Sequence, residues 1–236
     1  MGGIAATLEM YRRVFGRAGQ LILRNWPVLG SVLVYGLITT AAMIVGASLG
    51  AGSSLVGGLF VNLVWAACVG SFLSLIETMI RSGRVSWQDF GRSFGVYLWD
   101  VVGVTFIVWV VFAIVAPAVR TLPQGPGILI AMNLVLFVLF NAVPELIYLG
   151  HHSSLEVLTE SFTFISDNWI EWFPATIVPV FLLFLVLGLP LDGLLAWVKT
   201  AGLALIICVT MVARGLLFIE LRGSSRRGRA FQRAAR

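Results

Sequence analysis

The sequence predicts an all-α integral membrane protein with about six transmembrane helices, which form three hairpins that are each preceded by an interfacial amphipathic helix. Of its residues, 59% are hydrophobic and only 11% are charged, whereas about 25% of the residues in a soluble domain are charged. Apolar runs of about twenty residues, the length with which a helix crosses about 30 Å of hydrocarbon, follow one another along the chain. These runs are too long and too uniformly apolar for barrel strands, so helices are the predicted spanning elements.

The hydrophobic runs divide the chain into one polytopic membrane domain, 1–221, and a basic tail, 222–236. The expected spans are 27–48, 55–80, 98–118, 127–149, 171–190 and 196–219. The connections after the first, third and fifth spans are short and rich in Gly, Pro and Ser, which is typical of tight turns. The connections after the second and fourth spans are longer, polar and helical in pattern. We therefore expect hairpins that are joined through one membrane face.

The distribution of arginine predicts which face is cytoplasmic. Arginines gather in the N-terminal segment, in the loop after the second span and in the tail, whereas the opposite face has little beyond Arg120 and Lys199. Because positive charge stays on the cytoplasmic side, both termini are expected there, in a plasma (inner) membrane protein. The acidic connection that contains Glu156 and Glu160 departs from this pattern, but acidic residues contribute little to orientation. The arginine-rich tail is expected to attract anionic lipids, and no nucleic acid is needed to explain its charge.

Three segments share a pattern that suggests an internal repeat. Each begins with a hydroxyl residue that can cap a helix (Thr7, Ser86 and Ser154), and bulky apolar residues then form one stripe. The stripes comprise Leu8, Tyr11, Phe15 and Ala18; Trp87, Phe90, Phe94 and Tyr97; and Leu155, Leu158, Phe162 and Ile165. The candidate repeats are 7–80, 86–149 and 154–220. The predicted unit is an interfacial helix followed by a two-helix hairpin, present three times in the same orientation.

Three glutamates mark a common register in these candidate repeats. Glu77 and Glu145 each stand nine residues before the next hydroxyl residue, Ser86 and Ser154, and Glu220 closes the sixth span in a similar way. A chain of unrelated membrane hairpins would also give loosely similar connectors, so coincidence stays open as an alternative.

A polar stripe in the fourth span is the strongest candidate for a functional site. Its members follow one helical face and are Asn141, Glu145, Tyr148 and His152. Pro144 cannot donate a backbone hydrogen bond to the carbonyl of Phe140, so it is expected to kink the span.

The role of Glu145 has two interpretations, because a charged and unpaired carboxylate near lipid costs several kcal/mol. The stripe could form the wall of a transport path. The favoured alternative is structural: Glu145 lies near the cytoplasmic end of its span and binds its own connector or an arginine. Arg214, in the last turns of the sixth span, is the best candidate partner for Glu145 or Glu220, and such a pair would hold hairpins together.

Motifs for catalysis, cofactors or metals are missing from the sequence. Cys68 and Cys208 both lie inside apolar runs and are interpreted as small buried hydrophobic residues. His151 and His152 are adjacent, so they face different sides of a helix and make a poor metal site. No P-loop, zinc-protease motif or nucleophile elbow occurs. We therefore expect neither a cofactor nor a metal, and we favour a protein that is not an enzyme over an enzyme.

The sequence thus favours a non-enzymatic multi-pass inner-membrane protein, a permease-like or scaffold subunit of a larger membrane complex whose partners are other membrane subunits. One alternative is a secondary transporter or channel with a polar path around Glu145. Another is an intramembrane enzyme that acts on lipid through dispersed polar residues, which nothing in the sequence supports.

Overall fold

The computed structural model describes residues 2–49, 54–150, 154–191, 193 and 195–223, and within these residues the chain is helical and has no strand. The helices are α1 (Gly2–Arg24), α2 (Pro27–Leu49), α3 (Ser54–Ser82), α4 (Trp87–Ser93), α5 (Leu98–Arg120), α6 (Gly125–Leu139), α7 (Val143–Gly150), α8 (Ser154–Trp172), α9 (Pro174–Leu187) and α10 (Leu195–Arg222).

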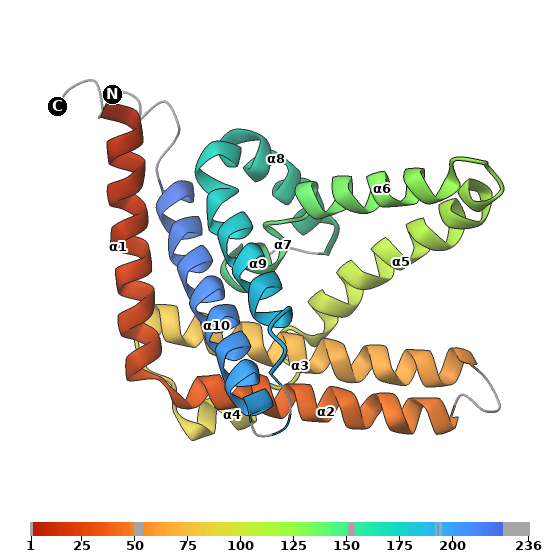
Figure 1. Ribbon diagram of the computed structural model, residues 1–236, viewed down its shortest axis with the longest axis horizontal. Helices are drawn as coiled ribbons and strands as arrows, with labels where there is room; N and C mark the ends of the chain where they lie inside the picture. The colour runs from red at the N-terminus through yellow and green to blue at the C-terminus, as the bar shows by residue number, and fades with distance from the viewer. Residues whose placement is uncertain (1, 50–53, 151–153, 192, 194, 224–236) are drawn as a thin grey trace.

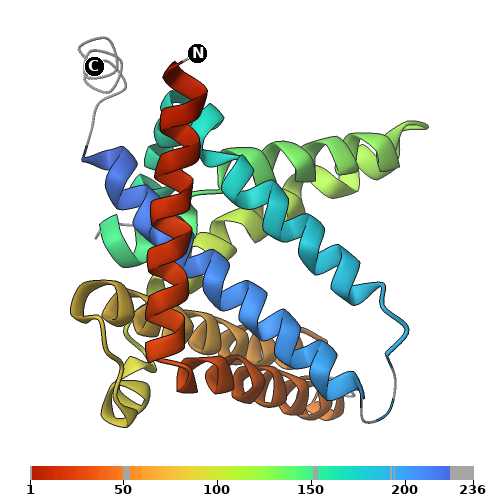
Figure 2. The ribbon, with the colours of Figure 1, turned by 60° about the vertical axis from the view of Figure 1, so that its left-hand side comes forward.

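The long helices are arranged in three consecutive pairs. Helices α2 and α3 lie side by side, α5 is paired with α6, and α9 is paired with α10, while α1 packs against α10 (Figure 1). When the molecule is turned, the connected ends of the three pairs point to one side (Figure 2). Helices α1, α4 and α8 lie at the opposite side, which we call the base of the molecule.

Within the described residues, five helical segments are long and apolar enough to cross a membrane. They are Pro27–Leu49, Val56–Ser82, Leu98–Arg120, Gly125–Gly150 and Leu195–Arg222. Helices α8 and α9 add a sixth if this pair, bent by 72°, is counted as one span. The fold is therefore that of an all-α membrane protein with five or six helices of spanning length.

The expected fifth span, 171–190, differs most from the structure. Helix α9 has only 14 residues, which at 1.5 Å per residue gives about 21 Å, less than the thickness of the hydrocarbon. The helix of α8 is distorted at Asn168, where φ is −127°. Pro174 then begins α9 at a first-turn position where its missing N–H costs little. Together these residues place the bend between α8 and α9 at the start of the predicted span, of which the structure keeps only the short helix α9.

The expected fourth span is interrupted near Pro144. Helix α6 ends at Leu139 and α7 begins at Val143, so the break precedes the proline. Pro144 is the second residue of α7, a position that suits proline. The freed carbonyl of Phe140 accepts a hydrogen bond of 3.1 Å from the N–H of Val143. The interruption is thus a short turn between two helices rather than a kink in one.

The connector helices differ from the predicted stripes in two respects. Helix α1 begins at Gly2, so Thr7 lies inside it and does not cap it, whereas Ser86 caps α4 in a reciprocal capping box with Asp89. The fully buried residues of α1 are Met10, Val14, Ala18 and Ile22. The predicted stripe of α1 is therefore turned relative to the buried face, because the helix packs one side against α10 and leaves Leu8 exposed.

Most of the hydrophobic core lies at the base, where α1, α3, α7, α8 and α10 meet. In the apolar window of α10, 50% of the residues are buried, whereas the windows of α5 and of α6 with α7 are 11% and 17% buried. The α5–α6 pair therefore extends as an arm from the packed base (Figure 1).

Candidate functional site

Four segments of the chain bring polar side chains together in the base. Asn141 lies in the turn between α6 and α7, and Glu145 follows in the first turn of α7. Trp172 ends α8, and Thr176 lies in the first turn of α9. Arg214 reaches them from the last third of α10. We call these five residues the Glu145 cluster.

An ion pair between Glu145 and Arg214 forms the centre of this cluster. The Nε of Arg214 donates to Oε1 of Glu145 at 2.8 Å, and its Nη2 donates to Oε2 at 2.9 Å. The side chain of Glu145 is 0% exposed and that of Arg214 is 9% exposed. Both carboxylate oxygens are therefore engaged by one guanidinium in the bidentate geometry that makes such pairs strong. The first turn of α7 also favours a negative charge, since backbone N–H groups gather there.

The other members of the cluster satisfy the remaining hydrogen-bonding groups around the ion pair. Arg214 also donates to the backbone carbonyl of Asn141 and, at 3.4 Å, to the hydroxyl of Thr176. The Asn141 side-chain oxygen accepts from Thr176 at 2.9 Å and from the indole N–H of Trp172 at 2.8 Å. The guanidinium carbon of Arg214 lies 4.9 Å from the ring centroid of Trp172, which adds a cation–π contact.

The helix break at 140–142 is stabilised by the same elements. The carbonyl of Leu139 accepts a hydrogen bond of 2.8 Å from Ser161 of α8. The carbonyl of Asn141 accepts from Arg214. Side chains of α8 and α10 therefore replace hydrogen bonds that a continuous helix would make itself, as buried backbone groups require.

Tyr148 lies beside the cluster and bonds to α10 rather than to Glu145. Its hydroxyl donates to the carbonyl of Met211 at 3.3 Å. A Cβ at Gly215 would lie 2.5 Å from this hydroxyl oxygen and 2.5 Å from Cδ1 of Ile80, so a larger residue would require Tyr148 and Ile80 to shift. His152, the last member of the predicted stripe, lies outside the described residues.

Glu77 and Glu220, the other two predicted acidic residues, form ion pairs of their own. Glu77 pairs with Arg81 at 2.8 Å and accepts a hydrogen bond from Tyr97. Burial, and then the hydrogen bond to Glu77, raises the pKa of Tyr97 above its usual range. Glu220 pairs with Arg13 at 3.0 Å. Each glutamate of the predicted register therefore binds an arginine, and the structure brings only Asn141, Glu145 and Arg214 of the predicted residues into one cluster.

Three members of this arrangement were not predicted from the sequence. Trp172 lies at the start of the predicted fifth span, a position typical of a tryptophan at headgroup level, but it is fully buried. Thr176 and Ser161 were assigned no role, although both bind the broken helix directly or through Asn141. Trp172 and Thr176 are four residues apart, a spacing that places two residues on one face of a continuous helix. The chain turns at Phe173 between them, so this spacing does not predict their common contact with Asn141.

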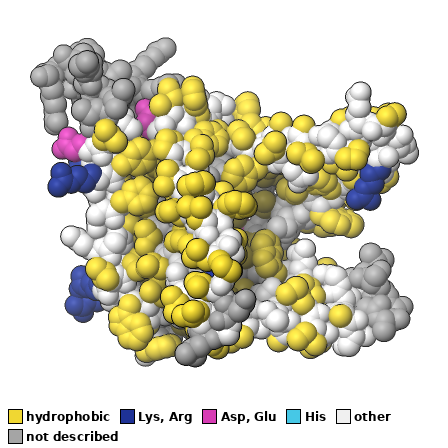
Figure 3. Space-filling view, in the orientation of Figure 1, with side chains coloured by type: hydrophobic (Ala, Val, Ile, Leu, Met, Phe, Trp, Pro, Cys, Tyr) yellow, Lys and Arg dark blue, Asp and Glu magenta, His cyan; other side chains and the backbone are white. Residues whose placement is uncertain are grey.

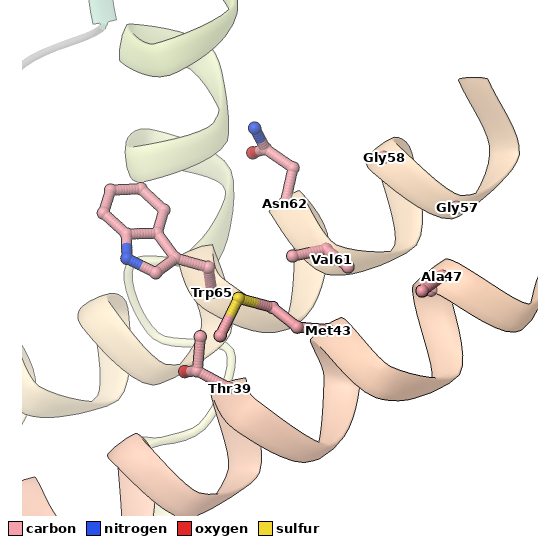
Figure 4. A pocket seen from close by; sticks show the side chains of 9 residues that line it. Thr39, Met43, Ala47, Gly57, Gly58, Val61, Asn62 and Trp65 are labelled. Atoms are coloured by element: carbon pink, nitrogen blue, oxygen red, sulfur yellow. The ribbon is translucent and has the colours of Figure 1, made fainter. Parts of the chain in front are cut away.

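Two grooves lie away from this cluster, among the far parts of α2, α3 and α5. The first has a volume of about 610 Å³ and follows the seam between α2 and α3 (Figure 4). The second, of about 430 Å³, lies between α3 and α5. Gly58 and Asn62 line both grooves, and neither groove includes a member of the Glu145 cluster.

The chemistry of the cluster is that of a closed electrostatic contact. Each carboxylate oxygen of Glu145 accepts a hydrogen bond from Arg214, so the buried negative charge is compensated within the protein. Comparison with family models, with curated proteins and with solved structures finds no match. Fold and site together define an all-α membrane protein in which a buried ion pair joins α7 to α10.

Proposed function

We propose that this chain is a non-enzymatic multi-pass subunit, scaffold-like or permease-like, of a larger inner-membrane complex. The observation that carries the proposal is the closed Glu145 cluster. It joins α7, the α8–α9 bend and α10 at the base through groups that satisfy one another. An intramembrane charge pair of this kind acts as a contact between helices. The α5–α6 arm, which extends from that base, is free to contact other membrane components.

The proposed topology consists of three hairpins, with their connectors at the cytoplasmic interface and both termini in the cytoplasm. The first apolar residue of each predicted connector supports it: Leu8, Trp87 and Leu155 are 64%, 81% and 66% exposed. Large apolar residues at the surface, on helices that also carry exposed charged side chains such as Arg12, Arg92 and Glu156, are typical of segments that lie in the interface. The recurrence of this feature at three related positions also supports the threefold repeat.

The subunit role can be tested by crosslinking from the arm. A photoreactive residue at Ile114, which is 70% exposed, should give a discrete protein adduct in native membranes, and the same residue at buried Ala116 should not. The two positions lie on α5, so expression and depth are matched. The protein purified in mild detergent should also carry a stoichiometric second chain. A strictly monomeric protein whose Ile114 variant labels only lipid would overturn the proposal.

A second candidate function is a secondary transporter or channel with its path around Glu145, and the helix break favours it. Broken helices at polar sites are found in transporters, where they line substrate and ion sites. The break at 140–142 lies directly before Glu145. In reconstituted vesicles, Glu145→Gln would abolish flux of the transported solute if Glu145 titrates during transport. Unchanged flux, with folding intact, would eliminate this candidate.

A further inference from the structure

Asn25 ties the end of α1 to the loop between α3 and α4. Its amide nitrogen donates to the carbonyls of Leu21 at 2.8 Å and Gly83 at 3.1 Å. Its side-chain oxygen accepts from the backbone N–H of Val85 at 2.8 Å. Asn25 is buried, with an exposed fraction of 4%. One side chain thus fixes two segments that are about sixty residues apart in the sequence.

This contact places the backbone of one arginine on each of the two segments that Asn25 joins. Arg24 precedes Asn25 directly, and Arg84 lies between the two loop residues whose backbone Asn25 binds. Consecutive α-carbons are 3.8 Å apart, so the α-carbon of Arg24 lies that far from Asn25, and the α-carbon of Arg84 lies that far from Gly83 and Val85. The backbones of both arginines therefore lie next to the Asn25 contact. Both side chains are exposed, and within the described part of the chain neither forms an ion pair.

The loop that carries Arg84 is held in one conformation. Gly83 has a φ of +73°, which favours glycine, and allows the turn out of α3. The hydroxyl of Ser82 donates to the carbonyl of Arg84 at 2.6 Å. On the other side, the N–H of Ser86 donates to the carboxylate of Asp89 at 2.8 Å. A ligand bound by Arg84 would therefore order little additional backbone, which favours affinity.

Two tryptophans mark the level of this junction in the membrane. Trp26 is 70% exposed and follows Asn25, and the exposed Trp87 begins α4. The neighbouring helices of spanning length begin at Pro27 and end at Ser82, so the junction lies where two candidate spans leave the hydrocarbon. Exposed indoles at span ends sit at headgroup level. Figure 3 shows Lys and Arg side chains at the edges of a largely hydrophobic face, as such a boundary requires.

We infer that this junction, formed by Arg24, Trp26, Arg84 and Trp87 around Asn25, binds a phosphate group, namely that of an anionic phospholipid headgroup at the base. Guanidinium groups bind phosphate oxygens through paired N–H donors, and arginine is preferred over lysine where that planar geometry matters. The tryptophans would then pack against the upper acyl chain and glycerol region. This site is distinct from the tail and does not depend on the proposed subunit role.

The test measures lipid retained by the purified full chain, by native mass spectrometry, from micelles that contain phosphatidylcholine and a minor fraction of phosphatidylglycerol. The double variant Arg24→Gln/Arg84→Gln should lower the apparent affinity for phosphatidylglycerol by about thirtyfold, as expected for two arginines near a charged surface. The control variant Arg12→Gln/Arg17→Gln removes the same charge from exposed positions of α1 and should lower it far less. Equal losses in the two double variants would overturn the site, because attraction would then be diffuse.

Two further experiments test whether the position of the arginines matters in addition to their charge, and whether the ligand is a lipid or a soluble phosphate. Asn25→Ala keeps both arginines and should still reduce retention, provided that its circular dichroism and melting temperature match the parent; full retention in such a folded variant would overturn the role of the junction. A chase with inorganic phosphate identifies the source of the ligand. Phosphatidylglycerol that stays bound supports a headgroup site, and its release by inorganic phosphate would overturn the lipid assignment in favour of a soluble phosphate.

Discussion

Helix α10 and the α5–α6 arm are both apolar enough to span a membrane, yet they are packed very differently. Half of the residues in the α10 window are buried, against 11% in the window of α5. The difference lies in the polar and small residues. The guanidinium of Arg214 in α10 binds side chains of α7 and α9 and lies over Trp172 of α8, whereas α5 joins the core mainly through apolar residues near its start, Val101 and Val104. Since lipid is as apolar as leucine, hydropathy brings a helix into the membrane but does not pack it against its neighbours.

The largest change in the free energy of unfolding is expected when the charge of Arg214, which joins α10 to α7, is removed. Arg214→Ala would leave Glu145 buried without its partner, which typically costs about 3–5 kcal/mol. Arg13→Ala removes the partner of Glu220 in an exposed pair and should cost about 0–1 kcal/mol. Equilibrium unfolding in mixed micelles, followed by circular dichroism, measures both. Equal effects would show that the buried pair does not organise the base.

A matched pair of leucine substitutions tests packing without charge. Leu217→Ala in α10 removes a fully buried side chain and should cost about 2–5 kcal/mol through the cavity that it leaves. Leu134→Ala in α6 changes an exposed position and should stay within about 0.5 kcal/mol. The same unfolding measurement applies. If Leu134→Ala lowers the melting temperature of the protein in native membranes but not in micelles, a partner covers the α5–α6 arm at this position.

Two glycine-to-alanine substitutions test the same contrast by adding a methyl group instead of removing side-chain atoms. Gly215→Ala would place a Cβ 2.5 Å from Tyr148 and Ile80 atoms, and overpacking of this kind costs about 1–3 kcal/mol. At Gly127 in α6 a Cβ meets nothing within 4 Å, so Gly127→Ala should be neutral or slightly stabilising. Thermal unfolding in detergent separates the two. A neutral Gly215→Ala would mean that α7 and α10 are less closely packed than described.

The same contrast explains how far the sequence could predict this molecule. Long apolar runs predicted the helices of spanning length, because the backbone has no other partner in lipid. The contact of Arg214 with Glu145 was predictable as one of two options, since charges inside apolar spans need partners. The bend at Phe173 and the burial of Trp172 could not be predicted from the sequence. Tryptophan occurs both at membrane interfaces and in cores, and Trp172 is buried because the fold brings Asn141 within reach of its indole N–H.

The smallest expected effect concerns α1, which binds the base through Tyr11. Its hydroxyl donates to the carbonyl of Glu171, and burial, then the nearby Glu171 carboxylate, raises the pKa of Tyr11 from 10.0 to about 12. The folded state therefore holds this proton more tightly than the unfolded chain, so the stabilisation is complete below pH 10 and is lost as the pH rises toward about 12. The difference in tyrosinate absorbance between the parent and Tyr11→Phe should show one late-titrating phenol. A phenol that ionises with the ordinary pKa instead would mean that Tyr11 is exposed to solvent and does not bind the end of α8.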